Sequence, residues 1–130
     1  VSIHIGINDT WHRAVNRAWL GNDVFEANYR KVLTEIKEKT NAKILMIEAF
    51  LLPDPEKEYF RVDLNSKIDI ERKLAREFAD YYIPLDGLLA QACVGQNCYH
   101  WSEDGVHPNA NGSEFIGRLY ADAFKKIISN

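Results

Sequence analysis

The chain has 130 residues, a length that fits a single domain, and 46% of them are hydrophobic, which suffices for one buried core. Its 16 Lys and Arg residues are nearly balanced by 19 Asp and Glu residues, so the net charge of −3 argues against nucleic acid as a partner. The longest apolar run, residues 44–53, is far shorter than the roughly 20 residues of a membrane span. We therefore expect a soluble protein without a membrane span, and a cytoplasmic location is favoured over a secreted one.

The first half of the chain alternates between strand and helix patterns. Apolar, mostly β-branched residues occupy every second position of residues 1–7, which predicts a strand. Residues 24–40 carry apolar side chains at helical spacing with charged side chains between them, which predicts an amphipathic helix. Residues 43–48 form a nearly continuous apolar run, typical of a strand buried on both faces of a parallel sheet. Pro53 and Pro55 then predict a loop.

The second half continues the alternation. Ser66 is followed three residues later by an aspartate, as in a capping box, so we expect a helix over residues 66–80. Residues 81–86 predict a third strand, and Pro84 assigns it to a sheet edge because proline cannot donate a hydrogen bond to a central ladder. A broad apolar face over residues 115–128 predicts the last helix.

This order of elements predicts one α/β domain over residues 1–130, in which helices cover the faces of a parallel sheet. Three strands make a small sheet. If the first strand lies at an edge, its unpaired backbone invites another strand. We therefore expect that either a missing N-terminal segment or a second copy of the chain lies beside it.

Ligands of such folds bind beyond the carboxyl ends of the strands, which here lead into residues 8–11, 49–54 and 86–107. The longest of these segments contains Asp104 and, three residues later, His107. At this spacing the carboxylate can accept the Nδ1 proton of the imidazole, which leaves Nε2 available as a general base. The alternative is a surface turn that Asp104 caps.

The turn after the first strand contains Gly6, Asn8 and Trp11. The side-chain amide of Asn8 can donate to the negative oxygen of a tetrahedral acyl intermediate, and Gly6 permits a close approach of neighbouring groups. Trp11 either stacks on a sugar ring or an aromatic ester, or covers the edge of the core. The alternative for Asn8 and Asp9 is a turn followed by a helix N-cap.

Two cysteines, Cys93 and Cys98, lie five residues apart. They can form a small disulfide loop in an oxidising compartment, but we favour two reduced thiols. With His100 and His107 they would make a zinc site of Cys and His ligands. We do not expect this metal site, because the spacing is not among the common zinc patterns.

The stretches Gly6-Ile7-Asn8-Asp9 and Asp104-Gly105-Val106-His107-Pro108 resemble two signature blocks of the SGNH (GDSL-type) hydrolase, or lipase-acylhydrolase, family. The resemblance implies a three-layer, flavodoxin-like fold. It implies that Asn8 lines the oxyanion hole and that Asp104 and His107 complete a catalytic triad. It implies no cofactor.

Residues 6–13 look like those of bacterial members of the family, including some that deacetylate plant-wall sugars. The resemblance thus implies a small-molecule or carbohydrate ester as substrate, with a short acyl group such as acetyl.

The family's Gly-Asp-Ser block lies upstream of the Gly-x-Asn-Asp block and has no counterpart here. No serine of the chain is expected in a strand-to-helix elbow; the candidates are Ser2, Ser66, Ser102, Ser113 and Ser129. We therefore expect that one or more N-terminal strands are missing, that a segment outside this chain supplies the nucleophile, and that the chain alone is inactive. The alternative is a non-catalytic binding or assembly module that keeps the fold without the nucleophile.

Overall fold

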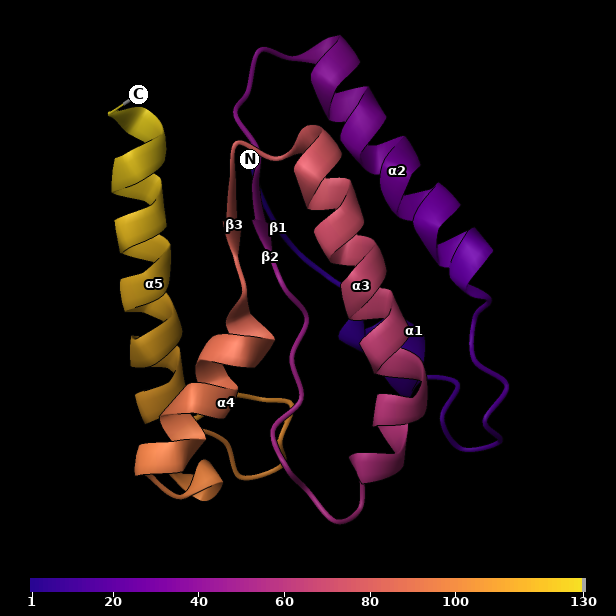
Figure 1. Ribbon diagram of the computed structural model, residues 1–130, viewed down its shortest axis with the longest axis vertical. Coiled ribbons are helices and arrows are strands. Elements are labelled where there is room, and N and C mark those ends of the chain that lie inside the picture. Colours follow the sequence, from indigo (N-terminus) through magenta and orange to yellow (C-terminus); the bar gives the residue numbers. More distant parts are fainter. Residues whose placement is uncertain (130) are drawn as a thin grey trace.

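The computed structural model describes residues 1–129, and its helices lie on both faces of a parallel sheet (Figure 1). Within the described part of the chain, β1 (Ser2–His4), β2 (Leu45–Ile47) and β3 (Tyr81–Ile83) form a sheet of order β1-β2-β3, with both pairs parallel. The α/β class predicted from the sequence is thereby confirmed.

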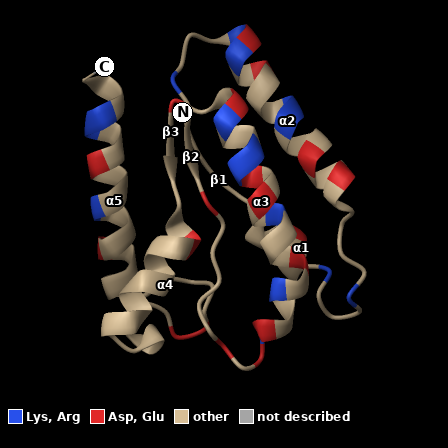
Figure 2. Cartoon of the chain, in the orientation of Figure 1, with Lys and Arg blue, Asp and Glu red and all other residues tan. Residues whose placement is uncertain are grey.

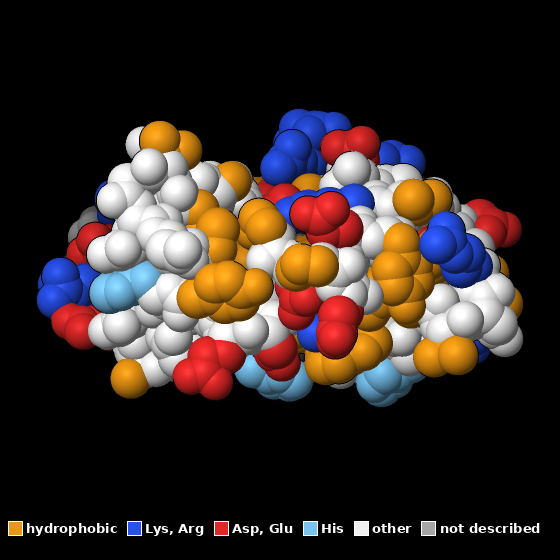
Figure 3. All heavy atoms as spheres, turned by 90° about the horizontal axis from the view of Figure 1, so that it is seen from below, with side chains coloured by type: hydrophobic (Ala, Val, Ile, Leu, Met, Phe, Trp, Pro, Cys, Tyr) orange, Lys and Arg blue, Asp and Glu red, His pale blue; other side chains and the backbone are white. Residues whose placement is uncertain are grey.

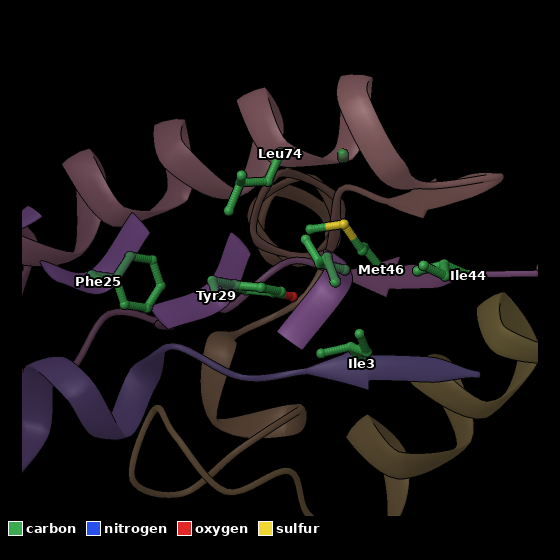
Figure 4. Close-up of a cluster of buried hydrophobic side chains, with 8 residues drawn as sticks. Ile3, Phe25, Tyr29, Ile44, Met46 and Leu74 are labelled. Carbon is green, nitrogen blue, oxygen red and sulfur yellow. The ribbon is translucent and has the colours of Figure 1, made fainter. Parts of the chain in front are cut away.

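Two helices cover one face of the sheet. They are α2 (Asn22–Lys39), close to the predicted helix over residues 24–40, and α3 (Arg61–Phe78). Figure 4 shows how Phe25 and Tyr29 of α2 and Leu74 of α3 meet Ile3 of β1 and Met46 of β2. Burial of such side chains stabilises each by roughly 1.5–3 kcal/mol, so this cluster holds both helices on the sheet.

The opposite face of the sheet packs against α4 (Leu85–Gly95) and α5 (Ala110–Ile128). Ile47 and Ile83 point to this side, where they meet Leu89 of α4 and Ala123 of α5. Charged side chains are spread along α2 and α3, whereas most of α4 is uncharged (Figure 2). No helix within residues 1–129 is long and apolar enough to cross a membrane.

The first predicted strand is too long. β1 ends at His4, and α1 (Ile7–Trp11) begins after Gly6, whose φ of +129° turns the chain. A backbone conformation of this kind favours glycine over residues that carry a Cβ atom. Asn8 therefore lies in the first turn of a helix and not at the end of a strand.

The predicted start of α3 at Ser66 is wrong. The helix begins at Arg61, directly after a 3-10 turn (Glu58–Phe60), and the Ser66 hydroxyl donates to the carbonyl of Asp63 from within the helix. The apolar face extends upstream to the buried Phe60 and Leu64, so tertiary burial sets this boundary.

The segment after β3 was expected to be a loop, and this too is corrected. β3 ends at Ile83 and Pro84 precedes α4, which is held by burial of Leu85 and Leu89 in the cluster beneath α5. A 3-10 turn (Cys98–His100) and the loop with Asp104 and His107 follow, and α5 starts five residues before the predicted apolar face. β3 lies at a sheet edge, as Pro84 indicated.

Candidate active site

Asp104 and His107 are hydrogen-bonded in the loop before α5. The Nδ1 atom of His107 lies 2.6 Å from Oδ2 of Asp104. The other carboxylate oxygen, Oδ1, accepts from the backbone N–H groups of Val106 at 2.9 Å and His107 at 2.7 Å. The side chain of His107 is 72% exposed. Asp104 therefore fixes the imidazole from one side while Nε2 remains accessible.

Partial burial acts to raise the pKa of Asp104, but the hydrogen bonds from the His107 ring and from two backbone N–H groups outweigh it. The net effect holds the pKa of Asp104 well below its usual range. The carboxylate is therefore charged at neutral pH, as is required of a group that orients and stabilises an imidazolium.

The loop is anchored to the chain after β2. Leu52 N–H donates to the Gly105 carbonyl at 2.9 Å, and Gly105 has a φ of +83°. A Cβ atom at Gly105 would lie 2.7 Å from the carbonyl oxygen of Leu52. Ser102 is buried, and its Oγ accepts from Gly105 N–H at 3.0 Å. These contacts make the Asp104–His107 turn part of the packed structure.

Gly6 and Asn8 lie where β1 turns into α1. Gly6 is buried, and a Cβ atom there would lie 2.5 Å from Oε1 of Glu71 and 3.1 Å from Cβ of Ala49. Gly6 was expected to allow a close approach of a neighbouring group, and that group is the Glu71 carboxyl of α3. Asn8 is exposed, and its side-chain amide makes no hydrogen bond within residues 1–129. The Asn8 donor is therefore available to a ligand.

Asn8 and His107 line the same cavity, which has a volume of about 570 Å³. Phe50 forms part of its wall after β2, and Tyr120 of α5 forms another part. The face that holds the carboxyl ends of the strands shows histidine side chains beside hydrophobic ones (Figure 3). A base and an amide donor thus face one partly apolar cavity.

Trp11 lies against the imidazole of His107, with ring centroids 5.5 Å apart. It also contacts Phe60 at 6.3 Å, and Lys57 Nζ lies 5.7 Å from the indole centroid. Trp11 therefore both borders the site and covers part of the core.

No serine hydroxyl in the described chain is hydrogen-bonded to the His107 ring. Ser113, in the first turns of α5, lines the cavity together with His107, but it lies within a helix and not in a strand-to-helix elbow. Ser102 Oγ lies 2.7 Å from the backbone carbonyl of His107 and 3.2 Å from Asp104 Oδ1. Ser102 supports the loop, and its hydroxyl is bonded to the backbone of His107 and not to its ring.

Sequence reasoning missed three acidic residues beneath the site, of which Glu48 and Glu71 are buried and Asp86 is half-buried. Glu48, directly after β2, is fully buried and accepts from Arg72 Nε at 2.8 Å and Tyr82 Oη at 2.6 Å. Asp86 of α4 pairs with Arg61 at 2.7 Å and accepts from Leu51 N–H at 3.1 Å. The one sign of these acidic residues in the sequence was Glu48, which interrupts an otherwise apolar run.

Glu71 is the third of these acidic residues. Its Oε2 accepts from Ala49 N–H at 2.9 Å, whereas Oε1 has no hydrogen-bond partner among residues 1–129. Burial raises the pKa of Glu71 to about 8, against the opposing effect of the Ala49 hydrogen bond. The carboxyl group under Gly6 is therefore mostly protonated at pH 7.

Residues 1–129 contain no group of three or more His, Cys, Asp or Glu side chains placed to hold a metal ion. Cys93 and Cys98 are free thiols, and burial together with a hydrogen bond to Cys98 raises the pKa of Cys93 to about 12.

Solved structures share this fold. A GDSL-like lipase candidate from Parabacteroides merdae is 29% identical, with a TM-score of 0.82 over 94% of this chain and 58% of its own. Axe2, an acetylxylan esterase from Geobacillus stearothermophilus, is 22% identical with a TM-score of 0.79, covering 100% of this chain and 59% of its own. LAE5, an alpha/beta hydrolase enzyme from the metagenome of Lake Arreo in Spain, is 16% identical with a TM-score of 0.81, covering 95% and 58%.

The chain spans less than three fifths of the length of each of these three structures. No curated protein matches it. The model of the GDSL-like Lipase/Acylhydrolase family, in contrast, matches residues 1–115, which include both blocks of the candidate site. The chain belongs to the GDSL-like lipase/acylhydrolase family.

Proposed function

We propose that the chain provides the general base, its orienting carboxylate and one oxyanion donor of a serine ester hydrolase. The observation that carries this proposal is the 2.6 Å contact between His107 Nδ1 and Asp104 Oδ2, beside a cavity that Asn8 also lines. A carboxylate on Nδ1 fixes the tautomer in which Nε2 accepts a proton. A serine from a segment outside this chain completes the triad.

In the proposed reaction the serine Oγ attacks the acyl carbonyl and passes its proton to His107 Nε2. Asp104 stabilises the imidazolium, and the Asn8 amide donates to the oxyanion of the tetrahedral intermediate. His107 then returns the proton to the leaving alcohol as the C–O bond breaks. Water attacks the acyl-enzyme with His107 again as base, which releases the acid and restores the serine.

The proposed substrate is a short acyl ester, such as an acetyl ester of a carbohydrate. The cavity of about 570 Å³ falls within the range of small-molecule sites and can hold an ester of this class. Trp11 beside His107 offers an aromatic edge for a sugar ring. The description of Axe2 as an acetylxylan esterase points to the same class.

The test measures hydrolysis of p-nitrophenyl acetate by the complete product of the gene and its variants. We expect His107→Ala to lower kcat/KM by about 10³-fold or more, because proton transfer from the nucleophile is lost. His12→Ala, which changes an exposed histidine outside the cavity, is the matched control and should retain wild-type turnover. Wild-type turnover in His107→Ala would refute the assignment.

The second candidate is a binding module without turnover. It is favoured by one observation, that no serine within residues 1–129 is bonded to the His107 ring. The 130-residue chain alone is expected to show no esterase activity under either proposal. If the complete gene product is also inactive and yet binds an acetylated sugar, the binding module is the correct reading.

A further inference from the structure

The carboxyl group of Glu71 contacts two separate segments of the chain that border the candidate active site. Its Oε2 accepts from Ala49 N–H at 2.9 Å, and Ala49 lines the cavity together with Asn8 and His107. Its Oε1 occupies the space that a side chain at residue 6 would fill, because a Cβ atom at Gly6 would lie 2.5 Å from it. One carboxyl group thus joins the turn between β1 and α1 to the chain after β2.

The position of the Asn8 amide depends on the backbone that carries it, because this side chain makes no hydrogen bond of its own within residues 1–129. One anchor of α1 is the Thr10 hydroxyl, which donates to Oδ2 of Asp63 on α3 at 2.6 Å. The other is the packing of Gly6 on the Glu71 carboxyl, directly before the helix. A donor to an oxyanion must be placed accurately, so both anchors matter for the site.

The contact between Glu71 and Gly6 suits a protonated carboxyl group better than a carboxylate. Glu71 is 1% exposed, and its Oε1 has no hydrogen-bond partner among the described residues. An unpartnered carboxylate oxygen costs far more to bury than an unpartnered hydroxyl group. Because Oε1 already fills the space beside Gly6, water can reach an ionised Oε1 only if the turn moves.

We propose that Glu71 is a positioning residue of the esterase reaction: its protonated carboxyl group fixes the turn from Gly6 to Asn8 against Ala49, and its ionisation releases this turn and lowers turnover. The inference rests on the proposed function, because it concerns the placement of the Asn8 donor. Glu71 does not line the cavity and acts through Asn8. A negative charge beneath the turn would also oppose the charge that develops on the oxyanion, so both effects lower turnover.

Titratable and charged groups surround Glu71 on the elements packed around it; they are Asp9 of α1, Tyr29 of α2, Glu48 after β2, Tyr82 of β3, Asp86 of α4 and, on α3 itself, Lys67 and Arg72. Burial raises the pKa of both tyrosines well above the usual range, so neither phenol ionises between pH 7 and 9. Lys67 is bonded to Asp63, and Arg72 is bonded to Glu48. Neither cation therefore stabilises a Glu71 carboxylate by a direct bond.

The first experiment measures kcat and KM of the complete gene product on p-nitrophenyl acetate between pH 7 and 9, with the rate of the ester in buffer subtracted. Burial raises the pKa of Glu71 to about 8, so we expect kcat to fall by about tenfold across this range as the carboxyl group ionises. KM should change by less than about twofold, because an oxyanion donor acts on the transition state. Circular dichroism at pH 9 checks that the protein stays folded.

Glu71→Gln keeps the neutral form at every pH, and its amide oxygen can still accept from Ala49 N–H. We expect its kcat to stay within about threefold of wild type at pH 7 and to show no fall up to pH 9. Glu38→Gln makes the same chemical change on an exposed face of α2 and should keep the wild-type fall. A wild-type kcat that is flat from pH 7 to 9, or a fall that persists in Glu71→Gln, overturns the proposal.

Thr10→Val separates this effect from a general loosening of α1. It removes the hydrogen bond to Asp63 and leaves Glu71, Gly6 and Ala49 in place. We expect the fall in kcat to keep its midpoint near pH 8, whatever the level of kcat at pH 7. If the fall disappears in Thr10→Val, it belongs to α1 as a whole and the proposal is wrong.

A third measurement does not use turnover. The backbone amide signals of Gly6 and Asn8 in the complete gene product, followed by NMR, should titrate with a midpoint near pH 8 in wild type and not in Glu71→Gln. If kcat does not fall while turnover still depends on His107, the proposed function stands and the role of Glu71 is refuted. If His107→Ala keeps full turnover, the proposed function fails, and amides that titrate with Glu71 still support its hold on the turn.

Discussion

Asp104 uses its two carboxylate oxygens for two different tasks. Oδ1 accepts backbone N–H groups that hold the turn, and Oδ2 contacts His107 Nδ1. In Asp104→Asn the carbonyl oxygen can still accept the backbone bonds, but the amide NH2 group then faces Nδ1 and favours the wrong tautomer of His107. We expect kcat of the complete gene product to fall by about 10²-fold or more while the fold is retained, as circular dichroism would show.

The matched control for this prediction is Glu103→Gln, which changes the neighbouring exposed acid. It removes the same charge from the same loop and touches no hydrogen bond to His107. Equal losses in the two variants would mean that loop charge, and not the Asp104–His107 contact, matters for turnover.

The pairing of Asp104 with His107 was predictable, because the two residues are three apart and one turn brings them together. The contact of Glu71 with Gly6 was not. The two residues are far apart in sequence, and nothing local marks Glu71 among the other charged residues of α3. Only the packing of α3 under the β1–α1 turn makes that carboxyl group part of the site.

At the scale of elements, prediction succeeded where a pattern is strong and local. The continuous apolar run of β2 is buried throughout, and α2 begins and ends within two residues of its predicted bounds. It failed for α4, whose glycines and short length resemble a loop and whose helix depends on burial of Leu85 and Leu89. Helices this short draw most of their stability from tertiary contacts, which sequence patterns do not display.

The junction of β1 and α1 depends on Gly6. An alanine at this position would have to adopt a φ of +129°, and its Cβ atom would collide with the Glu71 carboxyl group. We therefore expect Gly6→Ala to lower the free energy of unfolding by about 2–4 kcal/mol. Gly87→Ala in α4 is the control, since a Cβ atom at Gly87 meets nothing within 4 Å. It should raise the free energy by about 0.5–1 kcal/mol. Urea unfolding of the 130-residue chain measures both, and a neutral Gly6→Ala would contradict the contact.

At the scale of the whole molecule, one buried acid, Glu71, makes stability depend on pH. Burial raises the pKa of Glu71 to about 8 in the folded chain, and the nearby Glu48, Asp86 and Asp9 act in the same direction. The unfolded chain loses this proton near pH 4.5, the ordinary pKa of a glutamate side chain. Between these two pH values the folded state holds one more proton than the unfolded state, so the contribution of Glu71 to stability falls as pH rises from about 4.5 to 8.

Glu71→Gln removes this titration while its amide oxygen can still accept from Ala49 N–H. We expect variant and wild type to differ by less than about 1 kcal/mol at pH 5, and the variant to be more stable by several kcal/mol, on the order of 4, at pH 9. Urea unfolding across this range provides the measurement. Glu38→Gln on the outside of α2, where the side chain makes no ion pair within the described residues, is the control for the loss of one glutamate. If the difference in free energy of unfolding between Glu71→Gln and wild type stays constant from pH 5 to 9, Glu71 is already ionised in the folded chain. That result would contradict a protonated carboxyl group beneath Gly6.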